Sequence, residues 1–260
     1  MSVKLALIGG VYNNYIALDA AVKDAKKKGI DEIYCLGDLG AFGPYPDRVF
    51  PIIHDNNIKV IQGNYDHSVG NGLDDCQCGY TDPRDNYYAK LSYDYTFKNT
   101  SDENKKWLKE LPKKIRFEIY DKKVLLCHGS PRRTNEFLWE STTSDHFLKK
   151  MFDDFKADII IGTHTGIHWE RIVDEKLFAN VGVIGRPENN GKTYVGYSIL
   201  EINKNSTKIE YIPFEYDHLR LAKEMRDEKI PEPFIETILT GWWTTCLEVL
   251  PAKERIRGKF

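Results

Sequence analysis

Five short apolar segments, each followed by a glycine beside a polar residue, constrain the fold of this chain more than any other feature. The segments are residues 4–8, 32–36, 59–61, 123–127 and 159–161. Residues 15–28 have apolar side chains at helical spacing, and residues 46–54 are also expected to be helical. Strands that alternate with helices form parallel sheets, which bind ligands at the carboxyl ends of their strands. We therefore expect an α/β fold with a site where these segments end.

The remainder of the chain adds strands and ends in a helical extension. Further helices are expected at residues 102–111 and 144–155, and further strands at 115–119, 177–181, 194–202 and 207–213. Two short amphipathic helices are expected around residues 219–225 and 233–239. Because no low-complexity linker interrupts the chain, residues 1–215 are interpreted as one domain, with residues 216–260 as a C-terminal helical extension packed on it.

Composition and charge exclude several classes of partner. The 260 residues are 41% hydrophobic, which is enough for a sizeable core. Because 37 basic residues oppose 39 acidic ones, the net charge of −2 gives no general attraction to polymeric nucleic acid or to an anionic membrane. No apolar stretch approaches the about 18 residues of a membrane-spanning helix, and the first residues do not resemble a signal peptide. The sequence therefore predicts a cytoplasmic protein.

The cysteine content indicates free thiols. The chain has five cysteines, an odd number that does not suggest the disulfide framework of a secreted protein. They are Cys35, Cys76, Cys78, Cys127 and Cys246. Cys76 and Cys78 lie in a loop after Asn64 with one residue between them, so soft-metal binding or thiol redox chemistry is an alternative role for this pair.

The polar strand ends contain motifs whose order is informative. They are Gly37-Asp38, Gly63-Asn64-Tyr65-Asp66, His128-Gly129-Ser130-Pro131, Gly162-Thr163-His164-Thr165 and the segment from Asn180 to Pro187. In this order they resemble the motifs of the calcineurin-like metallophosphoesterases, and most closely those of the small bacterial and archaeal phosphodiesterases. The resemblance covers about residues 4–217 and implies a four-layer αββα sandwich with two central sheets. It also implies two divalent metals that activate a water for attack on phosphorus.

Three site positions of this family keep metal-ligating residues in the chain. The resemblance places the bridging aspartate at Asp38, the amide ligand at Asn64 and an imidazole ligand at His128. Five positions that hold aspartate or histidine in the family are changed here, to Gly10, Tyr12, Tyr65, Thr163 and Thr165. The three retained residues can ligate one divalent ion together with water. The sequence therefore predicts one Mn, Fe or Zn ion rather than two, with a metal-free protein as the alternative.

Three further side chains are candidates for catalytic roles. Tyr12 can donate a hydrogen bond to a phosphoryl group, and Tyr65 replaces the histidine that protonates the leaving group in many relatives. His164 is the third candidate. As an alternative, one of the three histidines His164, His67 and His168 adds a ligand to the metal. On an extended segment, the His164 imidazole would face away from the side that the two histidines of the family use.

Five residues are candidates for binding the substrate. They are Asn13, Asn14, Arg132, Arg133 and Arg186. Guanidinium groups match phosphate oxygens with paired donors. The two asparagines precede the first expected helix, where they can cap it and leave backbone amides for an anion. Capping alone and solvated surface arginines are the simpler interpretations.

These residues favour a hydrolase that acts on a phosphomonoester or phosphodiester of a small molecule or nucleotide. An inactive protein that binds phosphate or a nucleotide on the same fold is the first alternative. The second alternative is an enzyme of another reaction, whose pocket is lined by the residues at the changed positions. Those residues are Tyr12, Tyr65, Thr163 and Thr165, with Cys127 as a further candidate. The sequence does not select the substrate, and it leaves a homo-oligomer open.

Overall fold

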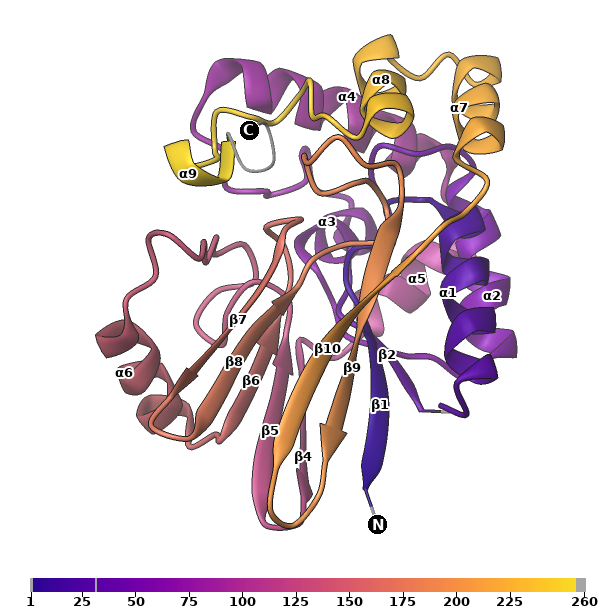
Figure 1. Ribbon diagram of the computed structural model, residues 1–260. Helices are drawn as coiled ribbons and strands as arrows, with labels where there is room; N and C mark the ends of the chain where they lie inside the picture. The colour runs from indigo at the N-terminus through magenta and orange to yellow at the C-terminus, as the bar shows by residue number, and fades with distance from the viewer. Residues whose placement is uncertain (1, 31, 256–260) are drawn as a thin grey trace.

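The computed structural model describes residues 2–30 and 32–255, which form two five-stranded sheets that face each other (Figure 1). The first sheet contains, in spatial order, β10 (Thr207–Phe214), β9 (Val195–Ile202), β1 (Val3–Ile8), β2 (Ile33–Cys35) and β3 (Lys59–Val60). Strands β1, β2 and β3 are parallel, whereas β9 is antiparallel to both β1 and β10. The three parallel strands therefore end at the same edge of the sheet.

The second sheet has the same proportion of parallel strands. It contains, in spatial order, β4 (Lys114–Ile119), β5 (Lys122–Cys127), β6 (Ile159–Gly162), β8 (Lys176–Val181) and β7 (His168–Val173). Strands β5, β6 and β8 are parallel, and the edge strands β4 and β7 are antiparallel to their neighbours. Both sheets thus bring loops from parallel strands to one end of the molecule.

Helices cover the outer faces of both sheets and the end of the molecule opposite the N-terminus (Figure 1). They are α1 (Tyr15–Lys27), the 3-10 helix η1 (Pro46–Arg48), α2 (Val49–Asp55), α3 (Asn64–Asn71), α4 (Pro83–Asn99), α5 (Asp102–Glu110), α6 (Asp145–Phe155), α7 (His218–Asp227), α8 (Glu232–Thr240) and α9 (Ala252–Arg255). Figure 1 shows α1 and α2 beside the first sheet and α6 beside the second. The expected four-layer αββα sandwich is confirmed. Among the described residues, no helix is long and apolar enough to cross a lipid bilayer.

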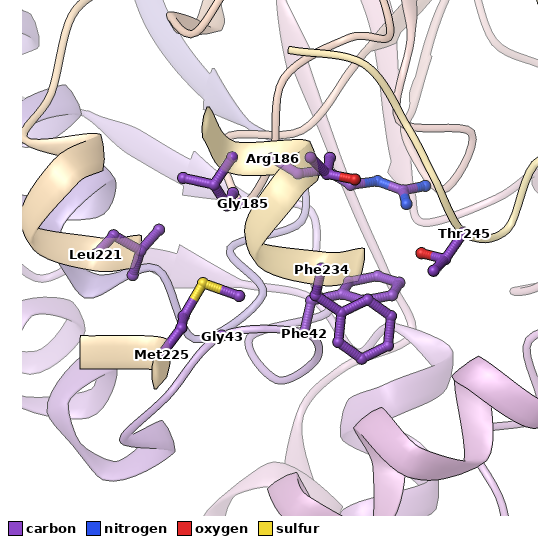
Figure 2. Close-up of a pocket in the computed structure, with 10 residues that line it drawn as sticks. Phe42, Gly43, Gly185, Arg186, Leu221, Met225, Phe234 and Thr245 are labelled. Carbon is purple, nitrogen blue, oxygen red and sulfur yellow. The ribbon is translucent and has the colours of Figure 1, made fainter. Parts of the chain in front are cut away.

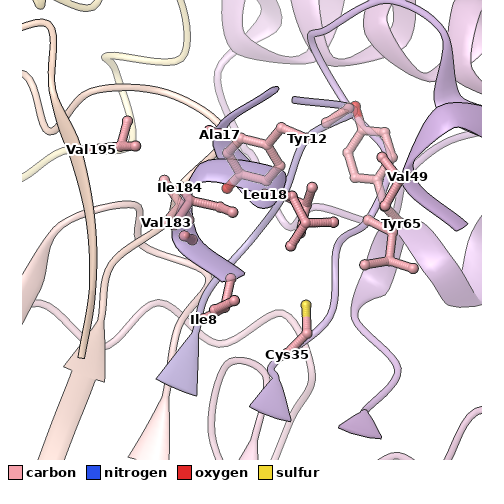
Figure 3. Packing of buried hydrophobic residues seen from close by; sticks show 14 of the residues in the cluster. Ile8, Tyr12, Ala17, Leu18, Cys35, Val49, Tyr65, Val183, Ile184 and Val195 are labelled. Carbon is pink, nitrogen blue, oxygen red and sulfur yellow. The ribbon is translucent and has the colours of Figure 1, made fainter. Parts of the chain in front are cut away.

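Strand β1 shows how the alternation of side chains divides the core. Leu5 and Leu7 are buried between the two sheets, whereas Ala6 and Ile8 belong to the cluster under α1. Figure 3 shows Ile8 in this cluster near Leu18 of α1. Because successive side chains of a strand point to opposite faces, one apolar strand supports two layers of packing. This is why the strand reads as a continuous apolar run.

The C-terminal extension packs on both halves of the sandwich. Helices α7 and α8 contact each other and place Met225 and Phe234 in the same buried cluster as α1. Beyond α8, Trp243 packs with Trp139 and with Ile167, which directly precedes β7. Figure 1 shows α7, α8 and α9 at the end of the molecule opposite the N-terminus. The extension therefore lies at the end where the loops of the parallel strands lie.

Helix α4 was not predicted, although it is the longest helix of the described chain. Its buried residues are Asp85, Ala89, Ser92, Tyr93 and Thr96, and all but Tyr93 are small or polar. Such residues give no apolar period, so the 3.6-residue signal is missing. Helix α3 and strand β7 were also not predicted. All the helices and strands that were expected are present, and their ends are shifted by a few residues at most.

The packing of α6 predicts a large effect of one substitution. Phe152 is fully buried against Leu125, Ile160 and Phe178 of the second sheet. We expect Phe152→Ala to lower the free energy of unfolding by about 3–5 kcal/mol, because it removes apolar contacts and leaves a cavity. Urea denaturation measures this change. Leu219→Ala is the control: its side chain is 64% exposed on α7, so a shift within about 0.5 kcal/mol is expected, and equal losses in both variants would contradict the packing.

Candidate metal centre

Four loops bring the candidate ligands together at the seam between the two sheets. Asp38 follows β2 and Asn64 begins α3 after β3, so the first sheet supplies these two residues. His128 follows β5 and His164 follows β6, so the second sheet supplies the two imidazoles. All four follow parallel strands, whose carboxyl ends meet at one edge. Their side chains are buried.

Asp66 holds the backbone of two of these loops in place. Its carboxylate accepts hydrogen bonds from the backbone amides of Asp38 at 2.7 Å, Gly63 at 2.8 Å and Leu39 at 2.9 Å. Burial and the charge of Asp38 raise the pKa of Asp66 to about 6. Gly63 permits the close approach, because a Cβ atom there would lie 2.2 Å from Asp38 Oδ1. Asp66 belongs to the motif Gly63-Asn64-Tyr65-Asp66, but nothing in the sequence pattern predicts this role for it.

The tautomer of His128 follows from one hydrogen bond. His128 Nδ1 lies 2.6 Å from the carbonyl oxygen of Leu36. A carbonyl only accepts, so Nδ1 carries the proton and Nε2 presents a lone pair when the ring is neutral. Nε2 lies 3.1 Å from Asp38 Oδ2 and 3.2 Å from His164 Nδ1. Burial lowers the pKa of His128. The negative charge of Asp38 and the hydrogen bonds of His128 to Asp38 and Leu36 outweigh burial, so that the pKa of His128 is raised overall.

The expectation that His164 faces away from the site is wrong. The segment is not extended at this residue, because His164 has a φ of 73°, in the left-handed region. The imidazole therefore turns toward His128. Burial, followed by the charge of His128, lowers the pKa of His164 to about 3, so the ring is neutral at pH 7. The hydroxyls of Thr163 and Thr165 bond to the backbone oxygens of Gly182 and Ile167.

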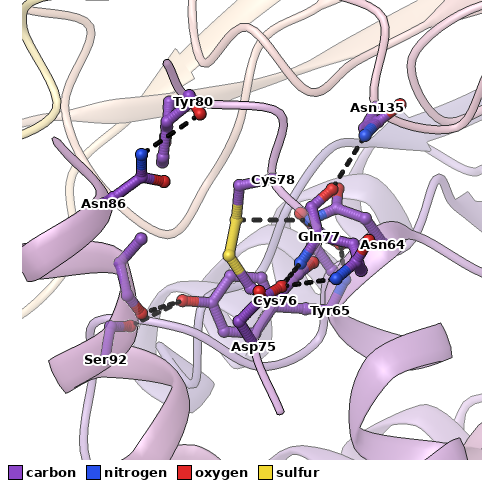
Figure 4. Close-up of a disulfide and its surroundings, with 12 residues drawn as sticks. Asn64, Tyr65, Asp75, Cys76, Gln77, Cys78, Tyr80, Asn86, Ser92 and Asn135 are labelled. Atoms are coloured by element: carbon purple, nitrogen blue, oxygen red, sulfur yellow. Dashed lines mark hydrogen bonds between the residues drawn. A yellow bond between two sulfur atoms is a disulfide. The ribbon is translucent and has the colours of Figure 1, made fainter. Parts of the chain in front are cut away.

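Asn64 presents a free oxygen in this region. Its side-chain nitrogen donates to the backbone oxygen of Cys76 at 2.9 Å and to Cys78 Sγ at 3.4 Å (Figure 4). Within the described chain, its Oδ1 is buried and has no hydrogen-bond partner. Cys76 and Cys78 form a disulfide, so the expectation of five free thiols is wrong for this pair, while Cys35, Cys127 and Cys246 are free and buried. An odd count does not exclude a disulfide closed within one short turn.

The donor set fits a divalent cation. One ligand atom each from Asp38, His128 and His164 lie within 4.8 Å of one another. Two imidazole nitrogens and a carboxylate oxygen that converge in a buried place require a proton or a cation between them. Asn64 lines the same cleft as His128, and its buried, unpaired Oδ1 is the candidate for a further, oxygen ligand. This mixture of oxygen and nitrogen ligands suits Mn, Fe or Zn.

The two candidate tyrosines lie differently. The Tyr12 side chain packs over Gly10 and Gly185, where a Cβ atom on Gly185 would lie 2.3 Å from Tyr12 Cβ. Burial raises the pKa of Tyr12 well above its ordinary value, so the phenol stays protonated. The Tyr65 hydroxyl instead donates to Ser92 Oγ of α4 at 3.0 Å. The structure does not bring that hydroxyl to the cluster; only the backbone amide of Tyr65 contacts Asp38 Oδ1, at 2.9 Å.

Asn13 and Asn14 make structural contacts. Asn14 caps α1, because its Oδ1 accepts from the backbone amide of Ala17 at 3.0 Å. Its side-chain nitrogen donates to the backbone oxygen of Gly185 at 3.3 Å. Asn13 donates to the backbone oxygen of Gly43 at 2.9 Å. The simpler interpretation, capping, is therefore confirmed for Asn14.

A cleft of about 440 Å³ opens beside the cluster. It is lined by Gln62, Asn64, His67, Leu73, Gln77, Lys113, Lys114, His128, Ser130, Arg132, Arg133, Thr134 and Asn135. Arg132 and Arg133 were expected to bind substrate, whereas Lys113 and Lys114 were not considered. Their signal in the sequence is a pair of lysines directly before a strand, which is too common to single out.

Arg186 lies outside this cleft. Its guanidinium carbon is 3.5 Å from the centre of the Trp243 ring and 4.9 Å from that of Phe42, and the side chain is buried. Figure 2 shows Arg186 above Phe42 and Phe234, beside a void that Gly185 and Thr245 also line. The void measures about 10 Å³, which is room for at most one water. The guanidinium of Arg186 is thus part of the packing of the C-terminal extension.

Comparisons with known proteins agree with the motifs. Residues 3–205 match the model of the calcineurin-like phosphoesterase superfamily domain. An uncharacterized protein of Methanocaldococcus jannaschii, MJ0912, is 29% identical over 252 residues, which cover 91% of this chain and 98% of that protein.

Two solved structures share the fold. Hypothetical protein PH1004 from Pyrococcus horikoshii superposes with a TM-score of 0.75 at 21% identity, and the alignment covers 93% of this chain and 100% of that one. A metallophosphoesterase from Sphaerobacter thermophilus superposes with a TM-score of 0.69 at 23% identity, with the same coverage.

The contacts of Asp66 predict the effect of replacing its carboxylate by an amide. In Asp66→Asn, one of the three backbone amides would face an NH₂ group and lose its acceptor. We expect the free energy of unfolding to fall by about 1–3 kcal/mol, the cost of one buried unpaired donor. Urea denaturation at pH 7 measures it. Asp74→Asn, on an exposed carboxylate of the following loop, is the matched control; identical midpoints for both variants would contradict the role of Asp66.

Proposed function

Because the chain belongs to the calcineurin-like phosphoesterase superfamily, we propose that it hydrolyses a phosphate ester of a small molecule or nucleotide with one divalent metal. The observation that carries the proposal is the convergence of Asp38, His128 and His164 within 4.8 Å. Asn64 supplies the fourth ligand through its unpaired Oδ1. Of the two roles expected for His164, catalytic group and additional ligand, the approach of its Nδ1 to His128 Nε2 supports the ligand.

The chain's own residues set the protonation states of the centre. When bound, the metal supplies a water of lowered pKa and polarises the phosphoryl oxygens. The Leu36 carbonyl keeps the His128 proton on Nδ1 and leaves Nε2 for the metal. The lowered pKa of His164 keeps that ring neutral at pH 7. The His164 imidazole is therefore ready to ligate without first losing a proton, whereas the raised pKa of His128 means that a metal at its Nε2 would displace a proton.

Changed residues support one metal rather than two. Gly10 and Tyr12 stand where the family has an aspartate and a histidine, and the Tyr12 ring packs over Gly10. Thr163 and Thr165 use their hydroxyls within the loop. A phenol that stays protonated is a hydrogen-bond donor, so Tyr12 is proposed to contact the substrate and not a metal.

The charge of the cleft supports an anionic substrate. Lys113, Lys114, Arg132 and Arg133 line it, and no carboxylate is among its lining residues in the described chain. Arg132 is partly neutralised by Glu136, whose Oε1 lies 3.1 Å from its guanidinium. The cationic side chains therefore raise the local concentration of a phosphate ester although the whole protein is slightly acidic.

Metal content and turnover test the proposal together. We expect the purified, untagged protein to bind about one divalent ion per chain and to hydrolyse bis-p-nitrophenyl phosphate only with metal. Asp38→Ala and His164→Ala are expected to lose both, because each removes a ligand. Elemental analysis and absorbance of released nitrophenolate measure the two quantities. His146→Ala, on an exposed histidine of α6, should keep both.

One result would overturn this function, and another would overturn the assignment of His164 as a ligand. Neither metal nor turnover in the wild-type protein would leave the phosphate-binding alternative, which a rise in melting temperature with added nucleotide would support. Full turnover in His164→Ala would show that this imidazole is no ligand.

The cationic cleft predicts a change in KM without a change in kcat. Lys113→Ala and Arg133→Ala should each raise KM about two- to fivefold, because an exposed charge contributes on the order of 0.5 kcal/mol. Added salt should reduce the difference from wild type. Initial rates over a range of substrate and NaCl concentrations measure this. Lys23→Ala, on the outer helix α1, is the control, and an equal rise there would contradict a role for the cleft.

A further inference from the structure

The loop that contains the disulfide is held at several points between α3 and α4. Cys76 is 3% exposed and Cys78 is 8% exposed. Between them, Gln77 has a φ of 52°, a left-handed turn that brings the two sulfur atoms to the same side. The backbone oxygen of Gln77 accepts from Asn135 Nδ2 at 2.9 Å, and its amide donates to Asp75 Oδ1 at 2.7 Å (Figure 4). The disulfide therefore sits in a defined place beside the cleft.

This loop provides both hydrogen bonds of the Asn64 amide nitrogen. One goes to the backbone oxygen of Cys76 and the other to Cys78 Sγ. If the amide turned over, Oδ1 would face the Cys76 carbonyl, an acceptor against an acceptor. The loop thus selects the orientation in which Oδ1 points away from it. That oxygen is the atom left buried without a partner in the described chain.

We propose that the Cys76–Cys78 disulfide positions Asn64 for metal binding, so that the redox state of this cysteine pair sets the metal affinity of the centre. The inference rests on the proposed function in one respect, the assignment of Asn64 as a ligand. Cys76 and Cys78 are positioning residues: they contact a ligand, and no contact with substrate is assigned to them. Outer contacts of this kind typically change metal affinity about 10- to 100-fold.

The redox step balances with a dithiol as the reductant. The dithiol gives two electrons and two protons, the S–S bond breaks, two thiols form, and the dithiol leaves as its own disulfide. Without the disulfide, Cys78 Sγ is free to turn away from Asn64. The backbone carbonyl of Cys76 is then no longer held in place by a covalent link to Cys78. The Asn64 amide then loses the two acceptors that fix its orientation.

Titration with Mn²⁺ alone tests the proposal on the full chain. Mn²⁺ prefers oxygen and nitrogen ligands to thiolates, so the new thiols do not compete as ligands. Free Mn²⁺ is followed by its electron paramagnetic resonance signal, with oxidised protein and with protein reduced by dithiothreitol and freed of it under argon. We expect reduction to raise the Kd about 10-fold or more and reoxidation to restore it.

Two variants separate the loop from general effects of reduction. In Cys76→Ser/Cys78→Ser, the Kd should equal that of the reduced wild type, with or without reductant, although three other cysteines remain. In Asn64→Asp, the carboxylate has no NH₂ group to orient, so its Kd should be the same in both redox states. Thermal unfolding of each sample verifies that it is folded.

The outcomes distinguish this inference from the proposed function. Mn²⁺ binding with an unchanged or lower Kd after reduction would overturn the inference and leave the function standing. Oxidised protein that binds no Mn²⁺, and no Fe or Zn by elemental analysis, would overturn both. Alkylation of the unfolded, unreduced protein should label three thiols, and five labelled thiols would show that the disulfide is absent and overturn the inference alone.

Discussion

A buried hydrogen bond from His128 Nδ1 to the Leu36 carbonyl connects the two sheets at the site. It places one imidazole proton on Nδ1, so that Nε2, which carries a lone pair when the ring is neutral, faces Asp38 and His164. The bond forms only because β2 and β5 end at the same level across the interior of the sandwich. The tautomer of His128, and with it the chemistry of the centre, therefore follows from the way the two sheets pack.

The remaining contacts hold carboxylates and imidazoles in the interior of the protein. Burial of such groups costs free energy when no cation is bound between them. Asp38 and Asp66 are buried, as are both imidazoles. The backbone amides that bond to Asp66 offset part of this cost, and the pKa of Asp66 is still raised to about 6. A bound cation would offset more, because it pairs with the carboxylate and both lone pairs at once. Some folding stability is thus given up for a preorganised site.

The sequence was informative where local pattern and topology agree. Asp38, Asn64 and His128 follow apolar strands, so their meeting at one edge could be predicted. The direction of His164 could not, because it depends on a positive φ at a histidine, which periodicity does not encode. The odd number of cysteines did not predict the disulfide, because it does not show whether two cysteines in one turn, Cys76 and Cys78, are bonded to each other. The position of Lys113 and Lys114 beside the site could not be predicted either, because only the structure shows that they line the cleft.

The pairing of β1 has a consequence for synthesis. In the first sheet, β1 lies between β2, which follows closely in the chain, and β9, where Leu7 pairs with Ser198. One edge of β1 therefore stays open while most of the chain is made, and an open apolar edge is a template for wrong pairing. The contact between Trp243 and Ile167 forms later still. A nascent chain shielded from its neighbours until β9 emerges would fold in higher yield than one released early.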